Sequence, residues 1–209
     1  MTVCNKTQHT LLTVCLSERF CAVVSRFYRL CLMGGLLLLT FVSGQLSADQ
    51  NHPDLDSLFM ELQKAQTNND ARRLEAEIWQ RWFDAPDDAA GDLLSQISAA
   101  MSVGRYQIAL QLCNQLVDTN PEFAEAWNKR ATVHYLMGNH GQSIADINQT
   151  LRLEPRHFGA LSGLGLIFMA SENFEAAADA FAAVLALSPG SDNARGSVAR
   201  AKSMIGEDI

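Results

Sequence analysis

The sequence has few cysteines, and they are unevenly placed. Of its 209 residues only five are cysteines, and Cys4, Cys15, Cys21 and Cys31 all lie within the first 31 positions. The fifth, Cys113, has no partner for a disulfide within residues 49–209. A domain built on disulfides is therefore excluded for this part of the chain. We expect Cys113 to be a small buried apolar residue and not a reactive thiol.

Recognisable catalytic and ligand-binding motifs are also missing. His134, His140 and His157 are not spaced with acidic residues or cysteines in a way that brings metal ligands onto one face. The glycines within residues 159–165 do not follow a strand, as a phosphate-binding loop would require. We expect no catalytic residues, no metal and no cofactor. A weakly catalytic or metal-dependent factor stays open as an alternative that an acid/base or ligand cluster would have to support.

Basic residues are outnumbered by acidic ones. The chain has 16 Lys and Arg against 23 Asp and Glu, and residues 49–209 alone carry 12 basic and 22 acidic residues, a net charge of −10. An acidic domain of this kind is a poor partner for nucleic acid. With 48% hydrophobic residues and only five prolines, the chain has enough apolar surface for a folded helical domain.

A repeated pattern organises the second half of the chain. Pro121, Pro155 and Pro189 are evenly spaced with a 34-residue period, and residues of matching type recur at fixed offsets before each of them. The matching sets are Tyr106, His140 and Phe174; Ala109, Ser143 and Ala177; Cys113, Ile147 and Phe181. Each unit holds two apolar stretches of helical length, such as residues 126–137 and 143–153, separated by residues 138–141. The pattern therefore predicts that each unit forms a helical hairpin whose apolar faces pack against the neighbouring units.

The third unit carries the clearest family signature. It reads Leu161-x2-Leu164-Gly165-x2-Phe168, then Ala177-x3-Phe181, then Pro189. The second unit keeps Trp127 but has Arg130-Ala131 where Leu-Gly is usual. This pattern resembles the tetratricopeptide repeat (TPR) family. The resemblance implies an all-α, right-handed superhelical solenoid with three units, at residues 90–123, 124–157 and 158–191. It also implies a scaffold that binds proteins, not an enzyme.

Two flanking segments are expected to be helical as well. Residues 49–89 contain two amphipathic stripes, which predict a degenerate amino-terminal hairpin that caps the array or is a decayed fourth repeat. Gln63 and Glu75 occupy its small-residue positions, which argues against regular packing, and we expect Trp79 and Trp82 to lie in its core. Residues 191–209 predict a capping helix over 192–205 that Gly206 ends.

Residues 1–48 have the layout of a secretory signal peptide. Basic residues precede an uncharged apolar run at positions 30–43, which small and polar residues follow. We expect cleavage after Gly44 or Ala48 and an exported, periplasmic protein. One alternative stays open for the location: residues 30–48 anchor the chain in the inner membrane with the domain facing the periplasm. Separately, a later translation start stays open, which would remove roughly the first 22 to 29 residues and keep the apolar run.

The resemblance also implies where a partner would bind. First helices of successive repeats line the concave face of a TPR array, and the positions that project there belong to three helices. They are Leu94, Ser98, Met101, Asn128, Thr132, Tyr135, Ser162, Leu166 and Met169. The expected partner is a peptide or protein segment, and the alternative function is a membrane-anchored accessory subunit of an envelope assembly or processing complex. The basic clamp that some TPR domains use for a carboxyl terminus is missing, since Lys129 stands alone.

Overall fold

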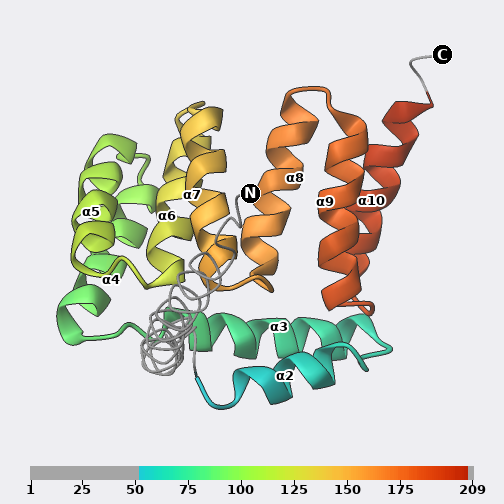
Figure 1. Ribbon diagram of the computed structural model, residues 1–209, viewed down its shortest axis with the longest axis horizontal. Coiled ribbons are helices and arrows are strands. Elements are labelled where there is room, and N and C mark those ends of the chain that lie inside the picture. The colour runs from blue at the N-terminus through green and yellow to red at the C-terminus, as the bar shows by residue number, and fades with distance from the viewer. Residues whose placement is uncertain (1–51, 207–209) are drawn as a thin grey trace, which may run out of the picture. The chain divides into compact units, whose positions relative to one another are not determined.

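The computed structural model describes residues 52–206, and this part of the chain is helical with no strand (Figure 1). The prediction of an all-α fold is confirmed for these residues. The helices are α2 (Leu55–Leu62), α3 (Asn68–Phe83), α4 (Asp88–Ser102), α5 (Tyr106–Thr119), α6 (Ala124–Leu136), α7 (His140–Leu153), α8 (Phe158–Ala170), α9 (Phe174–Leu187) and α10 (Asp192–Ile205). The predicted signal peptide lies outside the described residues. Across the described residues, no helix combines the length and apolar character that a membrane span requires.

The repeat period sets where the helices begin. Helices α6, α8 and α10 begin at Ala124, Phe158 and Asp192, and α5, α7 and α9 begin at Tyr106, His140 and Phe174, so each series advances by one full period of the repeat. Helix α7 begins slightly earlier than its apolar pattern suggested, because only residues up to Asn139 form the turn. Helix α10 covers the predicted residues 192–205.

Local side-chain contacts fix the hairpins. Asn173 is the predicted N-cap of α9, and its side chain accepts a hydrogen bond from the backbone of Ala176 at 3.2 Å. The small residue Ser143 lets α7 approach α6 closely, and its hydroxyl donates to the carbonyl of Ala131 at 2.8 Å. Gly165 has no room for a side chain, since an added Cβ would lie 2.5 Å from the ring of Phe181. Close helix contacts within each unit therefore depend on small residues.

Helices α2 and α3 form an amino-terminal hairpin that does not continue the stack of the repeat helices. Figure 1 shows α3 lying crosswise at the ends of the repeat helices. Its buried cluster includes Phe158 of α8, Val184 of α9 and Ala194 of α10. The segment between α9 and α10 passes close to the hairpin. An added Cβ at Gly190 would lie 2.9 Å from the carbonyl oxygen of Ala65.

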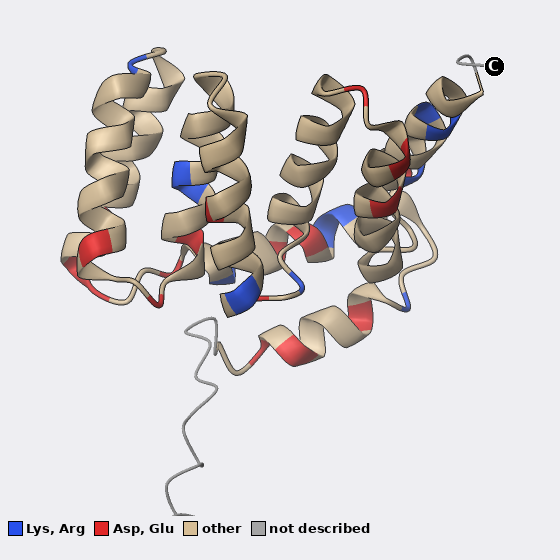
Figure 2. Cartoon of the chain, turned by 45° about the horizontal axis from the view of Figure 1, so that its top comes forward, with Lys and Arg blue, Asp and Glu red and all other residues tan. Residues whose placement is uncertain are grey.

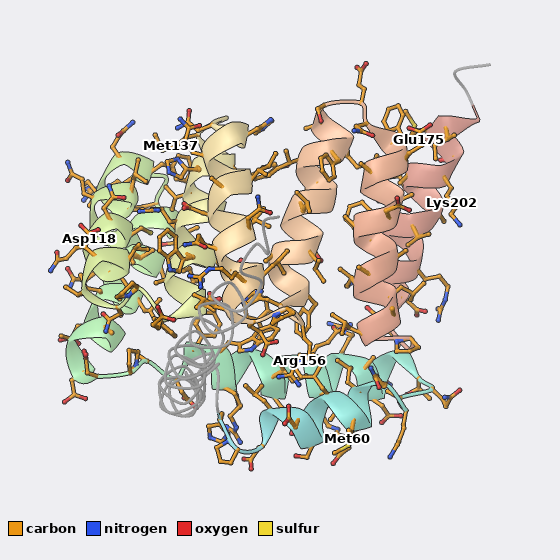
Figure 3. All side chains as sticks on the ribbon, viewed as in Figure 1. Met60, Asp118, Met137, Arg156, Glu175 and Lys202 are labelled. Atoms are coloured by element: carbon orange, nitrogen blue, oxygen red, sulfur yellow. The ribbon has the colours of Figure 1, made fainter. Side chains whose placement is uncertain are left out.

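Polar contacts hold the hairpin at this position. Arg156, labelled in Figure 3, lies between the second repeat and the hairpin. Its guanidinium donates to Asp56 at 2.7 Å and to Glu154 at 3.0 Å, and it covers the ring of Phe59 at 4.4 Å. Asp192 of α10 donates its backbone N–H to Asn68 at 3.1 Å. The hairpin therefore braces the second and third repeats and the capping helix.

Candidate functional site

A pocket of about 270 Å³ lies between α6 and α8, with α7 behind it. We call it the α6–α8 pocket. Its lining is formed by Asn128, Ala131, Thr132, Tyr135, Leu136, Ser143, Ile147, Gly159, Ala160, Ser162, Gly163 and Leu166. None of these residues is charged, and Figure 2 shows that α8 carries no charged residue along its length. The pocket is therefore an apolar slot with hydroxyl and amide groups on its walls.

Small residues on α8 make this slot. Gly159, Ala160 and Gly163 face it, and an added Cβ at Gly163 would meet only the end of Ile147 at 3.6 Å. On the rim, the large apolar side chains of Leu136 and Leu166 are 44% and 46% exposed. Apolar surface that stays open beside an unfilled slot is typical of a site that a partner covers.

Five of the nine predicted groove residues line the α6–α8 pocket: Asn128, Thr132, Tyr135, Ser162 and Leu166. The other four lie elsewhere. Leu94 is buried in the core of the first repeat, and Met101 packs against the same core. Ser98 is exposed on α4, and Met169 packs beside Ala201 of the capping helix. The structure therefore gathers the predicted residues of α6 with Ser162 and Leu166 of α8, while Met169 and the predicted residues of α4 do not contribute to this pocket.

Asn128 differs from its expected role as a free groove residue. Its side chain is only 7% exposed, and its amide donates to Glu125 at 2.9 Å. Glu125 is fully buried and also contacts Nε2 of His157 at 3.1 Å. Because Nδ1 of His157 accepts from the backbone of Ala160 at 3.1 Å, the imidazole proton sits on Nε2 and is donated to Glu125. Asn128 is thus one wall of the pocket and part of a buried polar cluster.

The amino-terminal hairpin packs directly on this cluster. The ring of Trp82 stacks on His157 with 4.1 Å between centroids and 10° between planes. Lys129 lies 4.6 Å from the ring centroid of Phe83 and 3.5 Å from Glu125. The lysine is therefore held between the hairpin and α6, and it does not line the α6–α8 pocket.

A second pocket, of about 330 Å³, lies on the other side of α8, and we call it the α8–α10 pocket. Its lining combines Glu75 and Trp79 of α3 with residues of α8, α9 and α10. Trp82 is buried as expected, but Trp79 is only half-buried and faces this pocket, so the prediction that both belong to the core holds for one of them. The unusual Glu75 at a small-residue position was the one sequence signal for this second pocket.

Several titratable side chains outside the two pockets are buried or paired. Burial raises the pKa of the Cys113 thiol to about 12, which keeps it protonated. The carboxylate of Asp146 accepts two hydrogen bonds from Arg130, at 2.8 and 2.7 Å, and this bonding raises the pKa of the guanidinium. Burial lowers the pKa of His134. Within residues 52–206, no group of three or more His, Cys, Asp or Glu could hold a metal ion.

Comparison with known sequences identifies the repeats. A family model described as "Tetratricopeptide repeat" matches residues 94–147 and, in an overlapping match, residues 129–192. A TPR repeat-containing protein of Rhizobium etli is 36% identical over 119 residues. The match covers 57% of this chain and 58% of the relative, so the chain spans less than two thirds of that protein.

Solved structures share the fold. The Sgt2 TPR domain from Aspergillus fumigatus has a TM-score of 0.55 and 25% identity, with 59% of this chain and 83% of that chain covered. The first TPR of Spaghetti (RPAP3), solved bound to the HSP90 peptide SRMEEVD, also has a TM-score of 0.55, at 19% identity, with 58% of this chain and 97% of that chain covered. The expectation of an all-α solenoid of helical hairpins is thereby confirmed.

Proposed function

We propose that this protein is a non-catalytic scaffold that binds a peptide or protein segment in the groove between α6 and α8, because residues 94–192 match the tetratricopeptide repeat model. One observation carries the proposal: the α6–α8 pocket is open, apolar and uncharged, and five of the residues that the repeat pattern assigns to the groove line it.

The lining indicates the kind of segment that would bind. An apolar side chain of the partner would fill the slot over Gly163 and be covered by Leu136 and Leu166. The hydroxyls of Thr132 and Ser162 on the two walls would supply hydrogen bonds to the partner's backbone. The proposed ligand is thus an extended or helical segment with an apolar residue that enters the slot.

An acidic carboxyl terminus is a poor candidate for this ligand. The RPAP3 domain takes an HSP90 peptide that ends in Glu-Glu-Val-Asp. In the present chain no basic residue lines the α6–α8 pocket, and Lys129 is engaged by Glu125 and Phe83. We therefore propose that the partner presents an apolar side chain, without a requirement for acidic groups.

We further propose that the protein acts in the bacterial cell envelope, outside the inner membrane. This part rests on the basic, apolar and small-residue order of residues 1–48, which is typical of a signal peptide. A relative from Rhizobium etli is compatible with a bacterial setting.

The groove proposal is tested by filling the pocket. Gly163→Leu would place an isobutyl group in the slot with no close contact at its Cβ, whereas Gly196→Leu adds the same group to α10 where no atom lies within 4 Å. Random peptides displayed on phage are selected on the purified protein and on both variants. We expect the wild type and Gly196→Leu to enrich the same peptides, and Gly163→Leu, with unchanged helicity, to enrich none of them. Equal enrichment by Gly163→Leu would place binding elsewhere.

A further inference from the structure

We propose that the α8–α10 pocket binds a basic side chain, lysine or arginine, of the same segment whose apolar residue occupies the α6–α8 pocket. The inference rests on the proposed function and adds the chemistry of a second binding position. Four observations support it: an acceptor carboxylate without a cation, an aromatic wall, a lining shared with the first pocket, and the charge of the domain.

Glu75 is the only charged residue in the lining of the two pockets. The hydroxyl of the buried Ser188 donates to its Oε1 at 2.7 Å, which orients the carboxylate in the lining of the α8–α10 pocket. Among residues 52–206 no basic side chain pairs with Glu75. Its neighbour Glu77, by contrast, is paired with Arg73 at 2.6 Å. Glu75 is therefore a half-buried, oriented carboxylate that still lacks a cation.

Three of the other lining residues are aromatic. Trp79, Phe158 and Phe181 all border the pocket. The ring of Trp79 is held in place because Gly159 leaves room for it, and an added Cβ there would lie 2.6 Å from a ring carbon. A carboxylate beside aromatic rings favours an ammonium or guanidinium group, which pairs with the carboxylate and is attracted to the rings. The aliphatic stem of lysine or arginine would pack on the same rings.

The two pockets are positioned to take neighbouring side chains of one segment. Gly159, Ser162 and Leu166 of α8 contribute to the lining of both. A chain that crosses α8 would therefore place one side chain on each side of this helix. Residues 52–206 hold 19 acidic and 12 basic residues, a net charge of −7, and this charge favours a basic partner.

The inference is tested with the same phage selection, read for sequence preference. We expect peptides selected on the wild-type protein to combine an apolar residue with Lys or Arg at a fixed spacing. For a synthetic peptide from that set, replacing the basic residue with norleucine should weaken binding about tenfold on the wild-type protein. On Glu75→Gln, whose amide oxygen still accepts from Ser188, the same replacement should change binding less than about twofold.

Glu77→Gln is the matched control, since it removes the same charge from α3 outside the pocket. It should keep the preference for a basic residue. Enrichment of apolar peptides without a basic residue, or a basic preference that persists in Glu75→Gln, would overturn this inference and leave the groove proposal standing. If no peptide is enriched on the wild-type protein, both proposals are wrong.

Discussion

At the scale of single residues, the turn inside each repeat requires one residue in the left-handed region. Gly104 and Gly138 fill this position in the first two repeats, with φ values of 71° and 76°. Glu172 fills it in the third, with a φ of 58°. A side chain in this region costs about 1 kcal/mol or more relative to glycine. The third turn therefore carries strain that the first two avoid.

Glu172→Gly is consequently expected to stabilise the protein by about 1 kcal/mol. The matched control is Glu175→Gly, in the first turn of α9, which should lower stability because glycine is unfavourable in a helix. Thermal or chemical denaturation compares the two variants with the wild type. A lower melting temperature for Glu172→Gly would contradict the proposed strain.

Single residues also mark where the sequence was least informative. Asn128 lies on the predicted groove face, yet its amide is turned to the buried Glu125. Glu125 lies in the first turn of α6 and His157 is the N-cap of α8, so their contact depends on how these two helices pack and leaves no periodic signal. Trp79 was expected in the core, but only its neighbour Trp82 is fully buried. Repeat spacing predicts which helix face a residue occupies, but it does not predict the hydrogen-bond partners of its polar atoms.

At the scale of helices, the hairpins depend on small residues at the crossing points. Ala177 of α9 is fully buried and packs in a cluster with Phe181 and Ala201. Ala177→Leu should lower the free energy of unfolding by about 1–3 kcal/mol, because the added carbons overpack this cluster. Ala182→Leu is the control, because Ala182 is exposed on the same helix. The melting temperature of this variant should stay close to that of the wild type. Equal melting of the two variants would mean that the repeat register is wrong.

The helices of the repeats could be predicted from the sequence, while the place of the amino-terminal hairpin could not. Turns, prolines and apolar stripes recur with the 34-residue period, so the helices assigned in one repeat support the assignment in the others. The hairpin α2–α3 has its own apolar stripes. They predict two helices, but they do not predict which part of the repeats these helices pack against. Its packing depends on contacts such as Trp82 with His157 and Ala65 with Gly190, which join residues far apart in the chain. The α8–α10 pocket was missed for the same reason, since α3 forms one of its walls.

At the scale of the whole molecule, the proposed site depends on the repeats and the amino-terminal hairpin meeting at α8. The repeats supply the α6–α8 pocket, and the crosswise hairpin adds Glu75 and Trp79 to the α8–α10 pocket. A partner segment that uses both pockets would contact residues from repeat helices, the capping helix and the hairpin. Binding should therefore require the complete domain, not an isolated repeat.

The proposed location makes a separate prediction about the mature chain. If residues 1–48 act as a cleaved signal peptide, the mature protein begins between Gln45 and Asn51. Intact-mass measurement of the protein purified from its native cells gives the first residue directly. A mass that includes residues 30–43 would instead favour the membrane-anchored alternative.

The most direct test of the groove is photocrosslinking in intact cells. A photoreactive phenylalanine analogue replaces Leu166, on the rim shared by the two pockets, or Val103, which is 66% exposed outside both. If the groove binds a partner, position 166 gives a protein adduct and position 103 does not. Gly163→Leu then abolishes the adduct, and the crosslink maps to a segment with an apolar residue. An adduct that survives Gly163→Leu, or no adduct at position 166, would mean that the partner does not bind in this groove.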